Sequence, residues 1–93
     1  MSLNAWENHL KMFESDPEYR KAWDALEDEF SIAEALIQAR MRAKMTQAEV
    51  ATAMGVSQPA IARIESGKSI SLKTLRRYAK ATGSKLKIEL AAG

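Results

Sequence analysis

Large apolar residues in the first third of the chain recur at intervals of four, three and four residues. They are Tyr19, Trp23, Leu26 and Phe30. This spacing predicts a helix with one apolar side. Asp16 and Pro17 favour a helix start, because aspartate caps free amide groups and proline fits the first turn. We predict a short helix over residues 5–13 and a second helix over residues 17–29.

The middle of the chain predicts two further helices, each preceded by a capping residue. Ser31 is a candidate cap for a helix over residues 32–44. The stretch from Thr46 to Glu49 forms a capping box, in which each of the two side chains bonds to the main-chain amide of the other residue. We expect the helix that starts there to end at Gly55.

Serine precedes each of the last two predicted helices. Ser57 opens a helix that carries Pro59 in its first turn, where a main-chain amide has no helical acceptor. Ser71 opens a helix over residues 72–82, and Gly83 is expected to end it.

The periodicity changes after residue 84. The stretch KLKIEL, residues 85–90, alternates polar and apolar residues, which is typical of a half-buried strand. It is the only strand candidate in the sequence, so its backbone groups need hydrogen bonds from another molecule. We therefore expect residues 86–90 to form part of a dimer contact by antiparallel pairing with a second copy.

Charge is distributed unevenly along the chain. Residues 1–30 contain eight acidic and three basic residues, whereas residues 31–93 contain four acidic and eleven basic residues. We expect an acidic helical arm over residues 1–30, a basic domain over 31–83, and a strand and tail over 84–93. The asymmetry suggests a polyanion as partner of the domain and a different partner for the arm.

The stretch TQAEVATAMGVSQPAIARIE, residues 46–65, predicts two helices joined by a sharp turn. It combines a small residue at the helix crossing, a glycine at the turn, an apolar plug and an isoleucine pair. These are Ala51, Gly55, Val56, Ile61 and Ile64. Glycine adopts positive φ freely, and the apolar residues are spaced to pack the two helices together. The combination is typical of a helix-turn-helix motif.

The motif TQAEVATAMGVSQPAIARIESGK resembles the helix-turn-helix of phage repressors and Cro proteins, also called the Xre family. The resemblance covers residues 32–82. It implies an all-α, lambda-repressor-like helical bundle, here with the N-terminal arm and a short C-terminal β-strand added. In that family the second helix of the motif lies in the major groove. The resemblance further implies a homodimer that binds double-stranded DNA at a palindromic operator and represses transcription.

The same resemblance implies DNA-binding roles for six residues. They are Gln47, Ser57, Gln58, Pro59, Arg63 and Lys68. Gln47 matches a phosphate-binding position, and Ser57 and Gln58 match positions near phosphate and bases. Glutamine pairs with adenine through two hydrogen bonds. Arg63 faces the same way toward guanine or phosphate, and Lys68 matches a loop that holds the phosphate chain. Pro59 replaces the polar residue often found there and offers only an apolar contact, such as one with a thymine methyl group.

Two further groups of charged residues lie in or beside the motif. Arg40 and Glu65 stand where several family members pair an arginine on the first domain helix with a glutamate that ends the recognition helix. We expect a largely buried, structural ion pair there. The last helix carries four basic residues that serve either as phosphate contacts or as a solvated face. They are Lys73, Arg76, Arg77 and Lys80.

Composition argues against several other classes of protein. The chain has no cysteine and a single histidine, His9, so we expect neither a disulfide scaffold nor a metal site, and a surface role for His9. Ser31, Ser57 and Ser66 have no histidine near them in sequence and no glycine elbow around them, so we expect neither an enzyme nor a cofactor. No apolar run approaches the ~20 residues that span a bilayer, and no signal pattern is present. We therefore expect a cytoplasmic protein without a membrane partner.

The order of the acidic aromatic arm, the motif and the stretch LKIEL is similar to HigA-type antitoxins. In those, a small DNA-binding protein neutralises a basic RNase toxin and represses its own operon. The resemblance implies that the arm binds such a toxin, which its acidic charge would suit. The arm alternatively packs on the domain or on a dimer mate.

Two other functions stay open at this stage. One is a stand-alone Cro-like regulator without a toxin, and the other is a protein-interaction or RNA-associated adaptor that reuses the bundle. A neighbouring small basic reading frame would favour the antitoxin.

Overall fold

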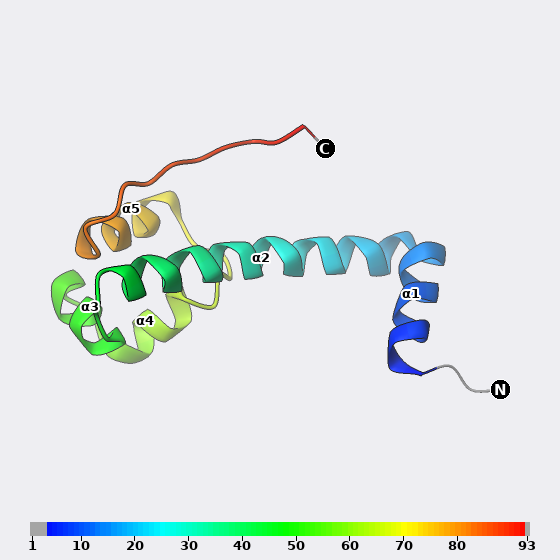
Figure 1. Ribbon diagram of the computed structural model, residues 1–93, viewed down its shortest axis with the longest axis horizontal. Helices are drawn as coiled ribbons and strands as arrows, with labels where there is room; N and C mark the ends of the chain where they lie inside the picture. Colours follow the sequence, from blue (N-terminus) through cyan, green and yellow to red (C-terminus); the bar gives the residue numbers. More distant parts are fainter. Residues whose placement is uncertain (1–3, 93) are drawn as a thin grey trace.

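Five helices make up the computed structural model, which describes residues 4–92 (Figure 1). They are α1 (Ala5–Ser15), α2 (Pro17–Arg42), α3 (Gln47–Met54), α4 (Gln58–Ile64) and α5 (Leu72–Ala81). Helices α3, α4 and α5 gather around one end of α2, and α1 folds against its other end, so the molecule measures 53 × 30 × 21 Å. No helix in this part of the chain is long and apolar enough to cross a membrane.

Helix α2 is continuous over 26 residues, so the predicted break at Ser31 was wrong. At 1.5 Å per residue it is about 39 Å long. Ser31 lies exposed within the helix, and serine costs only a few tenths of a kcal/mol there. No glycine or proline follows Pro17 within the helix to interrupt it. The helix therefore runs from the predicted arm into the predicted domain.

The arm is a helical hairpin closed by side-chain caps. Asp16 ends α1 and accepts hydrogen bonds from the amides of Glu18 and Tyr19 at the start of α2. Arg20 reaches back from α2 and donates to the carbonyls of Phe13 and Glu14 at 2.9 and 3.0 Å. These bonds satisfy two of the last four carbonyls of α1, and α1 extends to Ser15 rather than to residue 13 as predicted.

The core lies where α2, α3, α4 and α5 meet. Its buried side chains are Leu36, Ala39, Val50, Ala51, Met54, Ile61 and Tyr78. Val50, Ile61 and Tyr78 are almost completely inaccessible to solvent. Within residues 4–92, every buried side-chain nitrogen and oxygen has a hydrogen-bond partner.

Residues 84–92 run as an extended tail with no strand pairing, so the predicted β-strand over residues 85–90 was wrong. A strand needs a neighbour, and no other segment of residues 4–92 is a strand. Leu86 is half-buried in a groove beside α2 and α5, whereas Ile88 and Leu90 are 64% and 98% exposed.

The loop between α4 and α5 is held directly against α2. Gly67 in this loop is buried and has a φ of +76°, and a Cβ placed on it would run into the carbonyl oxygen of Glu29. It would also lie 3.2 Å from the amide nitrogen of Ala33. The close approach explains why only glycine fits here, and it fixes the motif to the centre of α2.

We expect Gly67→Ala to destabilise the fold more than Gly55→Ala. Gly55 also has a positive φ, +69°, but open space surrounds it. Both changes carry the left-handed strain of about 1–2 kcal/mol. Only Gly67→Ala adds a clash with backbone, which we expect to cost at least about 1 kcal/mol more. Urea unfolding of both variants would measure the difference, and equal losses would contradict the packing of Gly67 on α2.

Candidate nucleic-acid interface

The turn between α3 and α4 is set by local hydrogen bonds. The Glu49 amide donates to the Thr46 hydroxyl at 3.1 Å, and the Thr46 amide donates to the Glu49 carboxylate at 3.0 Å. Gly55 ends α3 in the left-handed conformation, and the Ser57 hydroxyl accepts from the Ala60 amide to open α4. Only three residues therefore separate the two helices, as the motif predicts.

Apolar packing holds the two helices together at this turn. Val50, Ala51 and Met54 are the buried residues of α3, and Ile61 is the buried residue of α4. Val56 is half-buried against the same core. The inward sides of both helices are thus used by the core, which leaves the polar residues at the start of α4 outside.

A buried carboxylate lies behind this turn. Glu65, at the end of α4, is 5% exposed. Its Oε2 accepts from Arg40 Nε at 2.7 Å and from the Tyr78 hydroxyl at 2.6 Å. Its Oε1 accepts from a second Arg40 nitrogen at 3.1 Å and from Gln47 Nε2 at 2.9 Å. The structure thus brings Arg40 and Glu65 together and adds Gln47 and Tyr78 to the pair.

The network favours the charged form of Glu65. Burial by itself raises the pKa of this carboxyl, but the bonds from Arg40, Tyr78 and Gln47 outweigh burial, so the pKa lies below its ordinary value. The bond to Glu65 raises the pKa of the Arg40 guanidinium. Burial and the neighbouring carboxylate raise the pKa of the Tyr78 phenol, which stays protonated and donates.

Two of the predicted DNA-binding residues are joined to each other. Gln58 Nε2, at the exposed start of α4, donates to Gln47 Oε1 at 2.7 Å. Because Gln47 also donates to Glu65, a chain of hydrogen bonds runs from the core to the outer surface of the motif. Gln47 keeps one N–H for another acceptor, such as the phosphate oxygen that the sequence predicts.

The other four predicted DNA-binding residues are exposed at or near α4. Ser57 and Pro59 flank Gln58 at the start of the helix, and Arg63 lies one turn after Pro59. Lys68 follows the helix in the loop, where its amide donates to the Ser66 hydroxyl at 3.4 Å. The six residues therefore occupy the start of α3, the length of α4 and the following loop.

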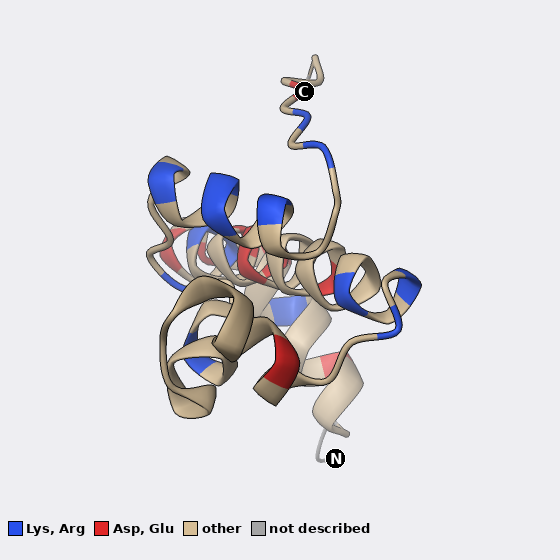
Figure 2. Cartoon of the chain, turned by 90° about the vertical axis from the view of Figure 1, so that its left-hand side faces the viewer, with Lys and Arg blue, Asp and Glu red and all other residues tan. Residues whose placement is uncertain are grey.

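Basic residues recur along the whole of α5, as the blue segments of the upper helix in Figure 2 show, and all four of their side chains are exposed. Arg77 has a structural contact that sequence reasoning missed, because it donates to the Met54 carbonyl at the end of α3 at 2.6 Å. Tyr78 was missed as well. Its position in the apolar stripe of α5 predicts burial, but only the structure shows which groups its hydroxyl meets.

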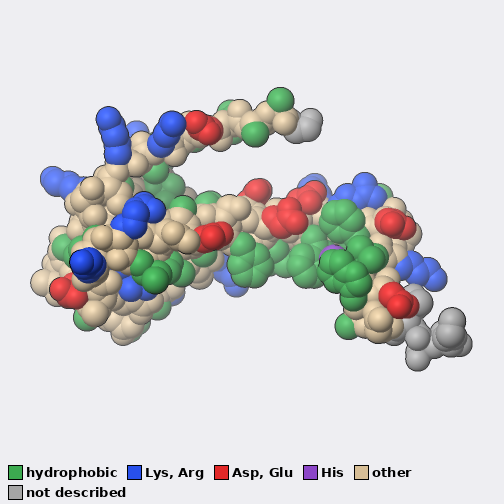
Figure 3. Space-filling view, in the orientation of Figure 1, with side chains coloured by type: hydrophobic (Ala, Val, Ile, Leu, Met, Phe, Trp, Pro, Cys, Tyr) green, Lys and Arg blue, Asp and Glu red, His purple; other side chains and the backbone are tan. Residues whose placement is uncertain are grey.

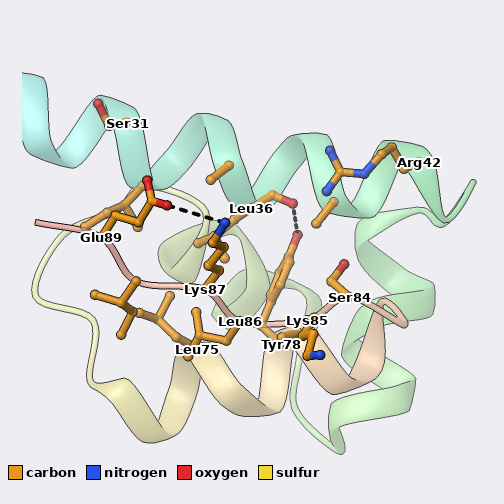
Figure 4. A pocket seen from close by; sticks show the side chains of 15 residues that line it. Ser31, Leu36, Arg42, Leu75, Tyr78, Ser84, Lys85, Leu86, Lys87 and Glu89 are labelled. Carbon is orange, nitrogen blue, oxygen red and sulfur yellow. Dashed lines mark hydrogen bonds and ion pairs between the residues drawn. The ribbon is translucent and has the colours of Figure 1, made fainter. Parts of the chain in front are cut away.

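A groove of about 600 Å³ lies between α2, α5 and the C-terminal tail (Figure 4). Leu36, Leu75, Tyr78 and Leu86 supply much of its lining, so it is mainly apolar. None of the six predicted DNA-binding residues lines it. Across the described range 4–92, no three histidine or acidic side chains gather as metal ligands.

Comparison with known proteins agrees with this geometry. The model of the family described as helix-turn-helix matches residues 36–88. The chain belongs to the Xre-type helix-turn-helix family. The helix-turn-helix of this family is a DNA-binding motif. No solved structure matches the chain significantly.

The chain is also similar to two proteins named Antitoxin HigA1, from the CDC 1551 / Oshkosh and H37Rv strains of Mycobacterium tuberculosis. Each is 35% identical over 77 residues, which cover 82% of this chain and 52% of the relative. The chain thus spans about half the length of these curated relatives.

We expect Glu65→Ala to cost about 3–5 kcal/mol of unfolding free energy, because it leaves the Arg40 charge without its buried partner. Glu89→Ala is the matched control. Glu89 pairs with Lys87 at 3.4 Å, but both side chains are more than three-quarters exposed, so its loss should have little effect. Thermal and urea unfolding followed by circular dichroism would measure both. A Glu65→Ala variant as stable as the parent would contradict the role of the pair.

The pH dependence provides an independent check. The folded pKa of Glu65 lies below the ordinary value of about 4.3. Its stabilisation is therefore complete above that value and is lost as the pH falls through the folded pKa. The stability gap between the parent and Glu65→Ala should be constant between about pH 5 and 7 and should shrink below about pH 4. A gap unchanged at low pH would show that the charge of Glu65 is not what stabilises the fold.

Proposed function

We propose that this protein is a sequence-specific transcriptional repressor, the antitoxin of a type II toxin–antitoxin pair that represses its own operon. It acts in the cytoplasm, where operator DNA is accessible. The observation that carries the DNA-binding part is the exposed start of α4, where Gln58 is held by Gln47. In this motif, the N-terminal end of the second helix contacts base edges in the major groove.

The six predicted DNA-binding residues divide into two roles in this proposal. Gln58 and Arg63 read base edges, and Pro59 contacts a thymine methyl group. Gln47, Ser57 and Lys68 contact phosphates on either side and set the register of the protein on the duplex. The excess of basic residues after residue 30 supports an electrostatic contribution to binding.

A single α4 contacts only a few base pairs, so specific repression favours a homodimer on a palindromic operator. Two half-sites one helical turn apart, about 34 Å, would combine two weak contacts into one specific complex. The family membership supports this arrangement.

The toxin-binding part of the proposal rests on the arm. Its surface carries exposed apolar side chains, which gather around His9 in Figure 3. The most exposed of them are Trp6 and Phe30, at 66% and 67%. Exposed apolar patches of this kind mark interaction sites, and the surrounding acidic residues would attract a basic partner. The similarity to proteins named HigA1 antitoxins supports a toxin as that partner.

We expect Gln58→Ala to weaken binding to the native promoter by about 5–150-fold and to leave binding to random duplex unchanged, because a bidentate base contact is worth about 1–3 kcal/mol. Lys68→Ala is the matched control. It should weaken binding to both duplexes and reduce the salt dependence by about 0.9 in log K against log salt. Fluorescence anisotropy over a range of salt concentrations would measure the affinity of the parent and of both variants for each duplex. Equal losses for Gln58→Ala on both duplexes would show that Gln58 reads no base.

We expect Phe30→Ala to weaken binding to the product of a neighbouring small basic reading frame by at least about tenfold, because buried aromatic anchors dominate interface energies. Met41→Ala is the control. Met41 lies on the same helix and is 65% exposed, but it is outside the arm. Calorimetry would measure the affinity of each variant for this product, and rescue of growth would show whether each variant neutralises it in cells. Promoter binding without affinity for any such product would instead support a stand-alone regulator.

A further inference from the structure

We infer that the acidic arm of one copy docks into the groove between α2, α5 and the C-terminal tail of a second copy, which returns the same contact. The inference rests on the homodimer of the proposed function and goes beyond it by naming the two surfaces that meet. Neither surface includes a predicted DNA-binding residue.

The groove has an apolar floor that the chain leaves partly uncovered. Leu36, Leu75 and Leu86 line it from α2, α5 and the tail (Figure 4). Ile88 also lines the groove and is 64% exposed, so the tail does not bury its own apolar side there. Exposed apolar surface in a concave site favours an occupant with apolar side chains.

The rim of the groove is basic. Arg42, Lys85 and Lys87 line it, and Glu89 is the one acidic residue among the lining residues. Glu89 pairs with Lys87 at 3.4 Å, whereas Arg42 and Lys85 have no ion-pair partner within residues 4–92. The occupant should therefore carry acidic side chains beside its apolar ones.

The arm of the same copy is held away from this groove. Helix α1 is fixed to the first turns of α2 by the bonds of Arg20 and by the contact of His9 with Trp23, whose rings lie 4.5 Å apart. Helix α2 then runs without a break to the other end of the molecule, where the groove lies (Figure 1). An arm that fills the groove must therefore come from another copy.

The outer surface of the arm has the required chemistry. Trp6, Leu10 and Glu14 follow one another at intervals of four residues, so they form one row along α1. Trp6 is 66% and Leu10 is 40% exposed. On α2, Glu27 lies one turn before Phe30, which is 67% exposed. Neither Glu14 nor Glu27 has an ion-pair partner within residues 4–92.

The two surfaces complement each other in both hydrophobicity and charge. Trp6 and Leu10 of one copy would cover the apolar floor of the other, while the carboxylates of the arm would face Arg42 and Lys85. Because arm and groove lie at opposite ends of α2, two copies with antiparallel α2 helices exchange both contacts at once (Figure 1). The result is a closed dimer with two-fold symmetry. The groove and the proposed toxin would then compete for the arm.

The test reverses the charges on each surface separately and measures self-association by sedimentation equilibrium. The proteins are the parent, the arm variant Glu14→Lys/Glu27→Lys, the groove variant Arg42→Glu/Lys85→Glu, and the control Lys73→Glu/Arg76→Glu. The control reverses two exposed basic residues of α5 that do not line the groove. Circular dichroism confirms that each variant is folded. The fifth sample is an equimolar mixture of the arm and groove variants, in which every arm meets a groove of opposite charge.

We expect the dimer Kd of the arm and groove variants to rise at least about tenfold, because like charges then face each other. The mixture should return to within about threefold of the parent Kd, and the control should stay within the same range. If the groove variant does not fold, the arm variant decides by comparison with the control.

A dimeric parent whose Kd neither reversal changes, or a mixture that does not recover, would overturn the inference alone. A parent that stays monomeric would overturn both the inference and the proposed homodimer. Promoter binding and toxin binding are measured separately, with Gln58→Ala and Phe30→Ala, so their failure is distinguishable from the failure of this interface.

Discussion

The carboxylate of Glu65 is the contact on which the rest of this structure depends. It ends α4 and accepts hydrogen bonds from Arg40 on α2, Gln47 on α3 and Tyr78 on α5, so one buried charge joins all four helices of the bundle. A buried charge is costly unless each of its lone pairs has a donor, and here the donors come from three helices. Glu65 therefore connects the end of α4 to the other three helices of the bundle, and through Gln47 to the exposed Gln58 at the start of α4.

The long helix α2 separates the helix-turn-helix motif from the helical hairpin of the arm. The motif surrounds one end of α2, and the acidic aromatic hairpin lies at the other end. In the proposed function, operator and toxin occupy opposite ends and do not compete for the same surface. The contact of Gly67 with the middle of α2 makes the helix a fixed connection between them, because the loop after α4 cannot shift without losing this close approach.

The sequence predicts the motif well because its signals are local. The Thr46 capping box, the glycine at residue 55 and the Ser57 cap each act within a few residues, and the structure contains all three. The continuous helix α2 was missed because Ser31 can cap a helix or lie within one, and no local signal decides between the two. The predicted strand was wrong for a related reason. Alternation of polar and apolar residues indicates one buried side, but it does not provide a neighbouring strand to pair with. The chain of hydrogen bonds from Glu65 through Gln47 to Gln58 joins residues that are far apart in sequence, so no local pattern predicts it.

The central claim is that the exposed end of α4 lies in the major groove of operator DNA. The most direct test is dimethyl sulfate protection on the native promoter, because this reagent methylates guanine N7 in the major groove and adenine N3 in the minor groove. The account predicts two protected clusters of guanine N7, about 34 Å apart along the duplex, with adenine N3 still reactive. Protection confined to the minor groove, or no protection at protein concentrations that saturate the promoter, would contradict it.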